Sequence, residues 1–485
     1  WKEKNILSDK LLFEQVKNVN EITPYAITCS TDRQINNIKE IIKSYLNSED
    51  SILKSSAAIA LNRLDPDNQQ AKDIINIILL NNDKSDIIEI IKHAKYSPEI
   101  FDQKQILSFL TSSYVDIQNQ ALIFIRSNPD LIYFDTIIGF LAIPALRINA
   151  EKALLSYPKI EVQTTLFTKF TNRKTEKGVT IGILKIIHHF YNIEIVKIII
   201  SKMDNPDLDI LNASSDALVK IFKSHSVNNR ELLRIENVIQ SLSKRAFQLH
   251  LFQNEIINDK DALLIIDHIN TDLKILCRVI IKLGTLKNSN VPLETYIRYI
   301  ESNDPDVFPL VLELIESTFS NDNKKLVISL IDPESNPVKS AIDYYGDQML
   351  SEDEMLKYWI ENPHRWKTNI AIQYILKKKK ISLLKKLNKK NQNKHFLEVD
   401  YFSIDEKYSI SQNFIKLEIK NEESLNMYSV LEKTILLKSV NLFKNIPGST
   451  LSKIAQLASE VQFDANYRIF NEGDQGDSLY VIISG

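Results

Sequence analysis

Residues 51–64 read SILKSSAAIALNRL, and this stretch decides the fold class. Its small and apolar residues recur at helical spacing, so it is predicted to form a helix with a small-residue face. An Ala-Leu pair lies near its end. Similar pairs recur at multiples of about 31 residues, and a period of that size is typical of repeat architectures. The pairs are Ala60-Leu61, Ala121-Leu122, Ala153-Leu154 and Ala217-Leu218, with Ile183-Leu184 and Ala371-Ile372 at related positions.

The segments around these pairs predict a unit of helix, turn and helix. A polar turn precedes each small-residue helix, as at residues 205–207 (NPD), and an apolar helix precedes the turn, as at 193–203. One helix pair cannot bury both of its apolar faces, whereas stacked pairs can. The predicted fold class is therefore mainly α. We expect a lead-in at 1–30 and a solenoid of about ten to twelve helix pairs over 31–390.

The period and the small-residue helix resemble HEAT repeats. The chain shows neither the aromatic and glycine pattern of tetratricopeptide repeats nor the TPLHxA pattern of ankyrin repeats. An irregular helical bundle with accidental spacing is the competing interpretation. A solenoid implies an extended surface, and the expected partner along it is another protein.

Composition narrows the class of protein. Of 485 residues, 44% are hydrophobic and 25% are charged, which suffices for a packed core. The formal net charge of −2 predicts no nucleic-acid partner. The longest apolar runs, such as 137–146, reach only about ten residues, whereas a membrane span needs about 20. The only cysteines, Cys29 and Cys277, fit a reducing, cytoplasmic compartment.

No motif for catalysis or metal binding is found in the sequence. HExxH, Walker, GxSxG and CxxC patterns do not occur. His188 and His189 are adjacent in a predicted helix, so their side chains are expected to point to different sides and not to chelate a metal ion. We therefore predict no catalytic residue, no metal ligand and a non-enzymatic function.

A lysine-rich run spans Lys377 to Lys394, with nine lysines and no acidic residue. One interpretation is contact with an anionic membrane surface or with nucleic acid. The other is a solvated helix face followed by a linker, here placed at 391–426. Lysine is abundant throughout the chain, which favours the second interpretation.

The distribution of glycine indicates a change of fold toward the end of the chain. Residues 427–446 and 449–461 predict two helices with a stop at Pro447-Gly448 between them. The segments YRIF (467–470) and LYVII (479–483) are rich in β-formers, so two strands are expected. Of nine glycines in the chain, four lie here: Gly448, Gly473, Gly476 and Gly485.

Between the two predicted strands, residues 471–478 (NEGDQGDS) predict a turn. Gly473 and Gly476 suit backbone conformations that are closed to other residues. Asp474 and Asp477 are expected to accept hydrogen bonds from nearby backbone N–H groups.

Residues 442–485 resemble the opening of a cyclic-nucleotide-binding domain. The patterns LFxxIP, LxxIAxxA and FxxxxxIFxEGDxGDxLYxIxxG carry the resemblance. It implies a β-roll, so residues 427–485 are expected to form the N-terminal, truncated part of such a domain. The motif residues with an expected structural role are Glu472, Gly473, Asp474, Gly476, Asp477, Tyr480 and Gly485.

In that family, an Arg meets the nucleotide phosphate and a Glu meets the ribose within a cassette that would follow Gly485. No cofactor-binding residue is therefore assigned in this chain, and the ligand that the resemblance implies for a complete domain is cyclic AMP or cyclic GMP. An acidic turn repels phosphate, so Glu472 and Asp474 are not assigned to the ligand. Because the sequence stops at Gly485, the last two strands are expected to be poorly supported.

Three further segments, 311–332, 361–376 and 431–443, resemble the soluble extension of bacterial ADP/ATP translocase-like nucleotide carriers. The resemblance implies a membrane domain before Trp1 and a location at the cytoplasmic face of the inner membrane. Two functions are expected. The leading one is a regulatory scaffold with a helical interaction surface coupled to cyclic-nucleotide sensing; the alternative is the soluble regulatory tail of a membrane ATP:ADP antiporter-like transporter.

Overall fold

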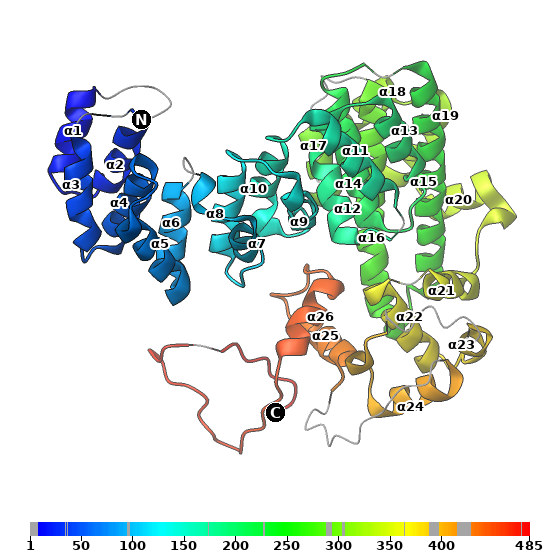
Figure 1. Ribbon diagram of the computed structural model, residues 1–485. Coiled ribbons are helices and arrows are strands. Elements are labelled where there is room, and N and C mark those ends of the chain that lie inside the picture. Colours follow the sequence, from blue (N-terminus) through cyan, green and yellow to red (C-terminus); the bar gives the residue numbers. More distant parts are fainter. Residues whose placement is uncertain are drawn as a thin grey trace. The chain divides into compact units, whose positions relative to one another are not determined.

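The chain is a mainly α protein. The computed structural model describes residues 8–33, 35, 37–94, 98–172, 174–226, 228–287, 293–302, 306–362, 364–387, 397–414, 428–476 and 478–485. Within these ranges the chain forms α-helices α1 to α26 and no β-strand (Figure 1). It divides into two compact units, Trp1–Ile195 and Val196–Gly485, which are described separately.

The first unit is built from short helices. They are α1 (Asp9–Lys17), α2 (Thr23–Asp32), α3 (Ile38–Ser44), α4 (Ser51–Leu64), α5 (Gln69–Asn81), α6 (Lys84–Ala94), α7 (Gln103–Leu110), α8 (Val115–Ile125), α9 (Phe134–Phe140), α10 (Pro144–Leu154), α11 (Lys159–Thr171) and α12 (Lys177–Ile186), and α13 (Ile193–Ser201) contains the boundary.

The second unit contains longer helices as well. They are α14 (Leu208–Phe222), α15 (Asn229–Ile256), α16 (Leu263–Gly284), α17 (Leu293–Ser302), α18 (Phe308–Thr318), α19 (Asn321–Ile331), α20 (Pro337–Tyr345), α21 (Glu352–Glu361), α22 (Arg365–Lys377), α23 (Ser382–Leu387), α24 (Ile404–Asn413), α25 (Val430–Ser439) and α26 (Gly448–Leu457).

Helix α4 has the bounds that the sequence predicts. The Asp50 carboxylate accepts hydrogen bonds from the N–H groups of Ile52 and Leu53, which caps the helix N-terminus. Helices α2, α3, α5 and α6 all pack against α4. Its small residues allow these neighbours to approach closely, and five of them are buried: Ser55, Ser56, Ala57, Ala58 and Ala60.

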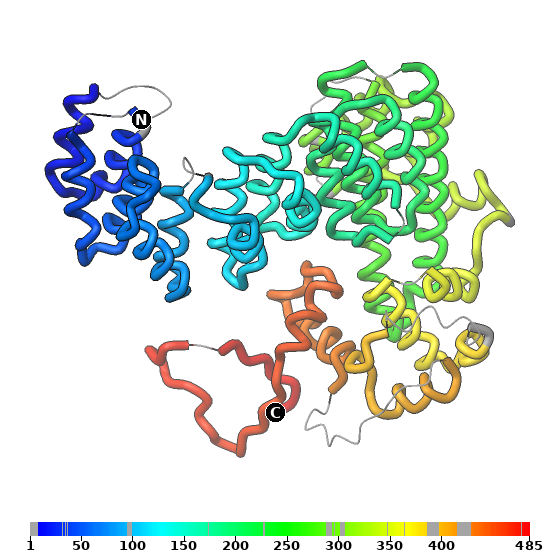
Figure 2. Tube along the Cα trace, in the orientation of Figure 1, coloured from blue at the N-terminus to red at the C-terminus, as the bar shows by residue number. Residues whose placement is uncertain are grey.

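The six residue pairs that define the 31-residue register are all buried, with at most 4% of each residue exposed. They lie on α4, α8, α10, α12, α14 and α22. In the first unit, α2, α4, α6, α8 and α10 each pack against the next one in this series, as the tube in Figure 2 shows. Asn149 on α10 also donates a 2.8 Å hydrogen bond to Asn119 on α8. This arrangement is consistent with a helical repeat.

The second unit departs from the predicted series of short helix pairs. It is organised around two long neighbouring helices, α15 with 28 residues and α16 with 22. Helix α14 packs on α16, and α19 and α20 pack on α15. Neither long helix contains a glycine or proline before Gly284, so no residue interrupts them.

The two helices predicted near the chain end are present as α25 and α26, and they pack against each other. The two predicted strands are not seen: the described residues of 458–485 form neither a strand nor a β-roll. A hairpin is stable only when another layer covers its apolar face. In this segment Phe470, Leu479 and Ile482 are exposed.

Two glycines of the first unit provide a test of its packing. A Cβ atom on Gly182 of α12 would lie 2.5 Å from the backbone oxygen of Leu141, whereas a Cβ on Gly139 of α9 would meet no atom within 4 Å. We expect Gly182→Ala to lower the free energy of unfolding by about 2 kcal/mol through overpacking. Gly139→Ala, the matched control, is expected to raise it by about 0.5–1 kcal/mol because alanine favours helix. Urea denaturation measures both, and stabilisation by both variants would contradict this packing.

Candidate functional site

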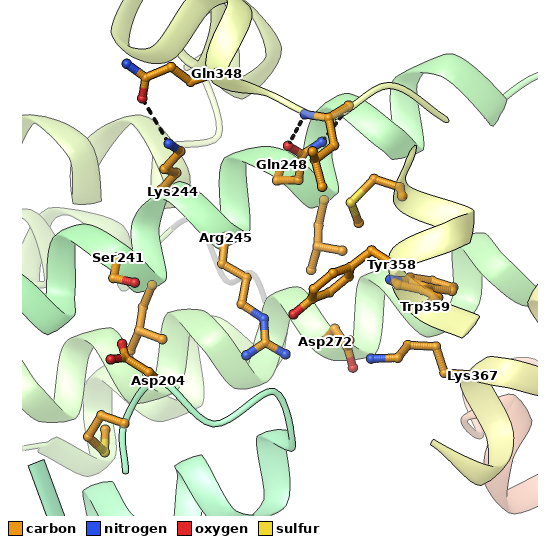
Figure 3. Close-up of a pocket in the computed structure, with 15 residues that line it drawn as sticks. Asp204, Ser241, Lys244, Arg245, Gln248, Asp272, Gln348, Tyr358, Trp359 and Lys367 are labelled. Carbon is orange, nitrogen blue, oxygen red and sulfur yellow. Dashed lines mark hydrogen bonds between the residues drawn. The ribbon is translucent and has the colours of Figure 1, made fainter. Parts of the chain in front are cut away.

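The second unit contains a cavity of about 500 Å³ between α15, α16, α21 and α22. Figure 3 shows polar groups of Arg245, Asp272, Tyr358 and Lys367 directed toward a common space. Leu242, Leu249, Leu350, Met355 and Trp359 contribute apolar surface to the same cavity. A few convergent polar groups in an apolar pocket are typical of small-molecule sites.

Arg245, on α15, is held by the turn that precedes α14. Its Nη1 donates to the carbonyl of Asn205 at 3.1 Å, and its Nη2 donates to the carbonyl of Pro206 at 2.6 Å. Burial lowers the pKa of this guanidinium, although an arginine stays charged in proteins. The two carbonyl bonds fix the plane of the guanidinium at the cavity wall.

Lys367, on α22, is a buried cation with only 6% of the residue exposed. Its Nζ lies 5.6 Å from the centroid of the Trp359 ring, a cation–π contact. The part of the chain that the structure describes supplies no hydrogen bond or ion pair to this ammonium group. Burial lowers the pKa of Lys367, and the nearby Asp272 carboxylate partly opposes that shift.

Asp272, on α16, is the buried carboxylate of the cavity, with 7% of the residue exposed. Burial raises its pKa to about 6, against the opposing effects of Lys367 and Arg245. Its Oδ2 lies 3.6 Å from Nε2 of His268. This approach is not an ion pair at neutral pH, because burial lowers the pKa of His268 to about 3 and keeps the imidazole neutral.

One wall of the cavity is closed by the segment between α20 and α21. The Gln248 side chain donates to the carbonyl of Leu350 at 2.8 Å and accepts from the N–H of Leu350 at 2.6 Å. Lys244 at the rim donates to the Gln348 side chain at 2.9 Å. These paired bonds hold the segment against α15, as the dashed lines in Figure 3 show.

The sequence did not point to this cavity, because its residues come from helices far apart in the chain. One feature of a single helix could have indicated the cavity. Residues 366–375 (WKTNIAIQYI) are all buried in α22, and Lys367 is the charged residue among them. A lysine that is buried together with all of its neighbours on a helix indicates a functional or paired cation.

The motif residues of the C-terminal segment do not line the cavity where the structure describes them. The Asp474 carboxylate accepts a 2.7 Å hydrogen bond from the N–H of Asn471, so it contacts the turn itself. Gly473 has a φ of +93°, whereas Gly476 does not have a positive φ. Asp477 lies outside the described residues. The others are exposed: Glu472, Tyr480 and Gly485, the last with a φ of +135°.

Two lysines of the lysine-rich run form ion pairs with carboxylates of the second unit. Lys378 pairs with Asp259 at 2.6 Å, and Lys380 pairs with Glu352 and Asp353, each at 2.7 Å. These ion pairs favour a structural interpretation over membrane contact for this part of the run. Residues 388–396 lie outside the described residues.

The rings of the two adjacent histidines of the first unit lie close together and tilted by 36°. The ring centroids of His188 and His189 are 4.0 Å apart, so the expectation that they point to different sides is wrong. Rotation about the side-chain bonds brings neighbouring rings together. Nε2 of His189 lies 2.9 Å from Oε1 of Glu151. Within the described ranges, no group of three or more His, Cys, Asp or Glu side chains could hold a metal ion.

Comparison of the chain with models of protein families, with characterised proteins and with solved structures gives no match. Across the described residues, no helix combines the length and the hydropathy needed to cross a membrane. The class of protein that the observations define is thus an all-helical protein with many packed helices and a charged cavity.

Proposed function

We propose that the chain is a non-enzymatic regulatory scaffold, in which a HEAT-like helical surface is coupled to a C-terminal cyclic-nucleotide-sensing segment. The observation that carries the proposal is the attachment of α25 and α26 to the centre of the second unit. These helices precede the motif at 463–485, and α26 packs directly on α16. The buried register pairs support the helical-repeat part of the proposal.

Three residues contribute to the attachment and are called here the Asp267 latch: Asp267, Lys438 and Gly448. Oδ2 of Asp267, on α16, accepts a 2.7 Å hydrogen bond from the N–H of Gly448, and Oδ1 lies 2.5 Å from Nζ of Lys438. The side chains of Asp267 and Lys438 are only 17% and 12% exposed. Charge-assisted hydrogen bonds at such partly buried positions are among the stronger ones in proteins.

Glycine is required in the latch by close approach. A Cβ atom on Gly448 would lie 2.9 Å from the Trp366 ring and 3.1 Å from Oδ2 of Asp267. The N-terminus of α26 therefore sits directly on the side chains of α16 and α22. A movement of α26 changes the surroundings of both helices.

In this proposal, ligand binding to the complete sensing domain shifts α25 and α26 between two packings on α16, which is a population shift. Helix α16 also packs against α14, α15, α17 and α22, so the shift reaches the helices that form the protein-binding surface. The transporter-tail alternative and the location at a cytoplasmic membrane face stay predictions. A run of membrane helices encoded before Trp1 would favour both predictions, and a start codon close to Trp1 would exclude them.

Calorimetric titration of the full-length protein with cyclic AMP and with cyclic GMP tests the sensing half of the proposal. We expect saturable binding of one nucleotide, together with a change in amide hydrogen exchange in α25 and α26. Absence of binding for both nucleotides would overturn the sensing half and leave the scaffold half standing.

A further inference from the structure

We propose that the cavity of the second unit binds a small organic phosphate, with the phosphate group held between Arg245 and Lys367. The site is separate from the C-terminal motif and does not rest on the proposed function. It is built by α15, α16, α21 and α22 of one compact unit. Three independent observations lead to it: hydrogen-bond donors, charge and the apolar wall.

The first observation is the number of N–H donors that remain at the cavity wall. An arginine side chain has five N–H groups and a lysine has three. Arg245 uses two of its groups on the carbonyls of Asn205 and Pro206, and Lys367 uses none with the residues that the structure describes. Phosphate oxygens match such donors well, since each oxygen accepts more than one hydrogen bond and the guanidinium binds two oxygens at once.

The second observation is the charge of the cavity. Two cations, the half-buried Arg245 and the buried Lys367, line the cavity with one buried carboxylate, Asp272. Asp207 does not line the cavity, but its carboxylate lies near both cations and stays charged while it caps α14 by accepting from the N–H of Asp209 at 3.0 Å. At the rim, Lys244 and the exposed Asp204 offset each other in sign. The described residues give the Lys367 ammonium group no hydrogen bond or ion pair, and an anionic ligand would supply a direct partner for it.

The third observation is the apolar part of the cavity lining. Trp359, Leu242, Leu249 and Met355 provide it, and the volume of about 500 Å³ falls in the range of small-molecule pockets. Inorganic phosphate alone would leave this wall without a partner. The ligand is therefore expected to carry an aromatic or otherwise apolar body, with the phosphate at the end that faces Arg245 and Lys367.

The competing explanation is that Arg245, Asp272 and Lys367 form a purely structural ion triad. The variant Lys367→Met separates the two, because methionine keeps the length of the side chain and removes the charge. If the cation is kept for a ligand, the variant loses an unfavourable buried charge, and its Tm is expected to rise by about 2–4 °C. A structural triad predicts a fall in Tm instead, because Asp272 would lose its partner.

The experiment is thermal unfolding and calorimetric titration of the whole chain with inorganic phosphate and with phenyl phosphate, at constant ionic strength. We expect phenyl phosphate to raise the Tm in a concentration-dependent way and to bind at least about tenfold more tightly than inorganic phosphate. Lys367→Met and Arg245→Met are each expected to weaken binding by at least about tenfold. The control is Lys357→Met, which neutralises a lysine of α21 that does not line the cavity and has 46% of its side chain exposed; this variant should bind like the wild type.

Each outcome of these titrations distinguishes the organic-phosphate site from its alternatives. Equal affinity for the two probes would assign the site to free phosphate and overturn the organic ligand. No binding of either probe, or unchanged binding by Lys367→Met, would overturn the site altogether. A fall in the Tm of Lys367→Met, with no loss of phosphate binding, would establish the structural triad.

Discussion

Replacing Asp267 with alanine is expected to lower the free energy of unfolding of the second unit by about 3 kcal/mol. The change removes both acceptors of the Asp267 latch. The Lys438 ammonium, which is mostly buried, would keep only its 2.6 Å bond to the carbonyl of Ile446. The N–H of Gly448 would lose its partner close to the Trp366 ring, and an unpaired buried donor is unfavourable by about 1–3 kcal/mol.

Hydrogen exchange measures this effect where it arises. Amides of α25 and α26 are expected to exchange faster in Asp267→Ala, while those of α4 in the first unit keep their rates. Gly448→Ala should give the same pattern for a steric reason, because the added methyl group collides with Trp366 and Asp267. Agreement between two variants with different physical causes would assign the effect to the latch itself.

A nearby carboxylate provides the control. Asp261 pairs with Lys378 at 3.1 Å, but its side chain is 42% exposed. Exposed pairs contribute about 0–1 kcal/mol, so Asp261→Asn is expected to leave both stability and exchange close to those of the wild type. Unchanged exchange of α25 and α26 in Asp267→Ala would show that other contacts hold these helices.

Acid is expected to destabilise the second unit by about 3 kcal/mol between about pH 6.5 and 4.5. Two histidines cause this. Burial lowers the pKa of His250 to about 4 and that of His268 to about 3, whereas an unfolded histidine titrates near about 6.5. Below about pH 6.5, the unfolded chain binds protons that the folded chain does not. Stability is therefore fully present above that pH and is lost as the pH falls.

Asp272 acts in the opposite direction. Burial raises its pKa to about 6 from a model-compound value of 3.8, so the folded chain binds this proton first. Protonation of Asp272 stabilises the folded state as the pH falls through about 6. This effect offsets the destabilisation caused by about one of the two histidines. For these three groups together, the net difference of about one proton gives about 1.4 kcal/mol per pH unit.

Urea denaturation of the second unit at several pH values tests the balance. The variant His268→Gln removes one histidine proton, so the dependence of unfolding free energy on pH is expected to become nearly flat. Asp272→Asn should make it steeper by about 1.4 kcal/mol per pH unit. A change in packing shifts the unfolding free energy by the same amount at every pH, whereas the loss of a titrating group changes its slope against pH. A slope that is the same in wild type and His268→Gln would contradict a neutral, buried His268.

The helices could be predicted where the deciding information is local. For α4, the cap at Asp50, the small-residue face and the Asp65-Pro66 stop all lie within residues 50–66, and the observed bounds agree with the prediction. The 31-residue register does not predict the long helices α15 and α16, because it implies short helix pairs over the whole range 31–390. Their uninterrupted sequences, without glycine or proline in the helix interior, carried the contrary signal.

The predicted strands and the cavity depend on contacts between distant residues. The β-forming residues of 467–470 and 479–483 indicate strands, but a strand also needs a neighbouring strand, which no local pattern supplies. Arg245, Asp272 and Lys367 meet because α15, α16 and α22 pack together. Their spacing in the sequence follows no chelation or catalytic motif, so packing alone brings this cluster together.

The buried small residues of α4 also have a consequence for how the sequence can diverge. Four neighbouring helices meet α4 across side chains no larger than a methyl or hydroxymethyl group at Ser55, Ser56, Ala57, Ala58 and Ala60. Because these positions are buried, a larger residue at any of them would overpack the core around α4, whereas Leu or Ile elsewhere in the core can be exchanged with modest repacking. Substitutions at these five positions should therefore be confined to Gly, Ala and Ser, and distant relatives of the chain should be recognisable there after the remaining surface has changed.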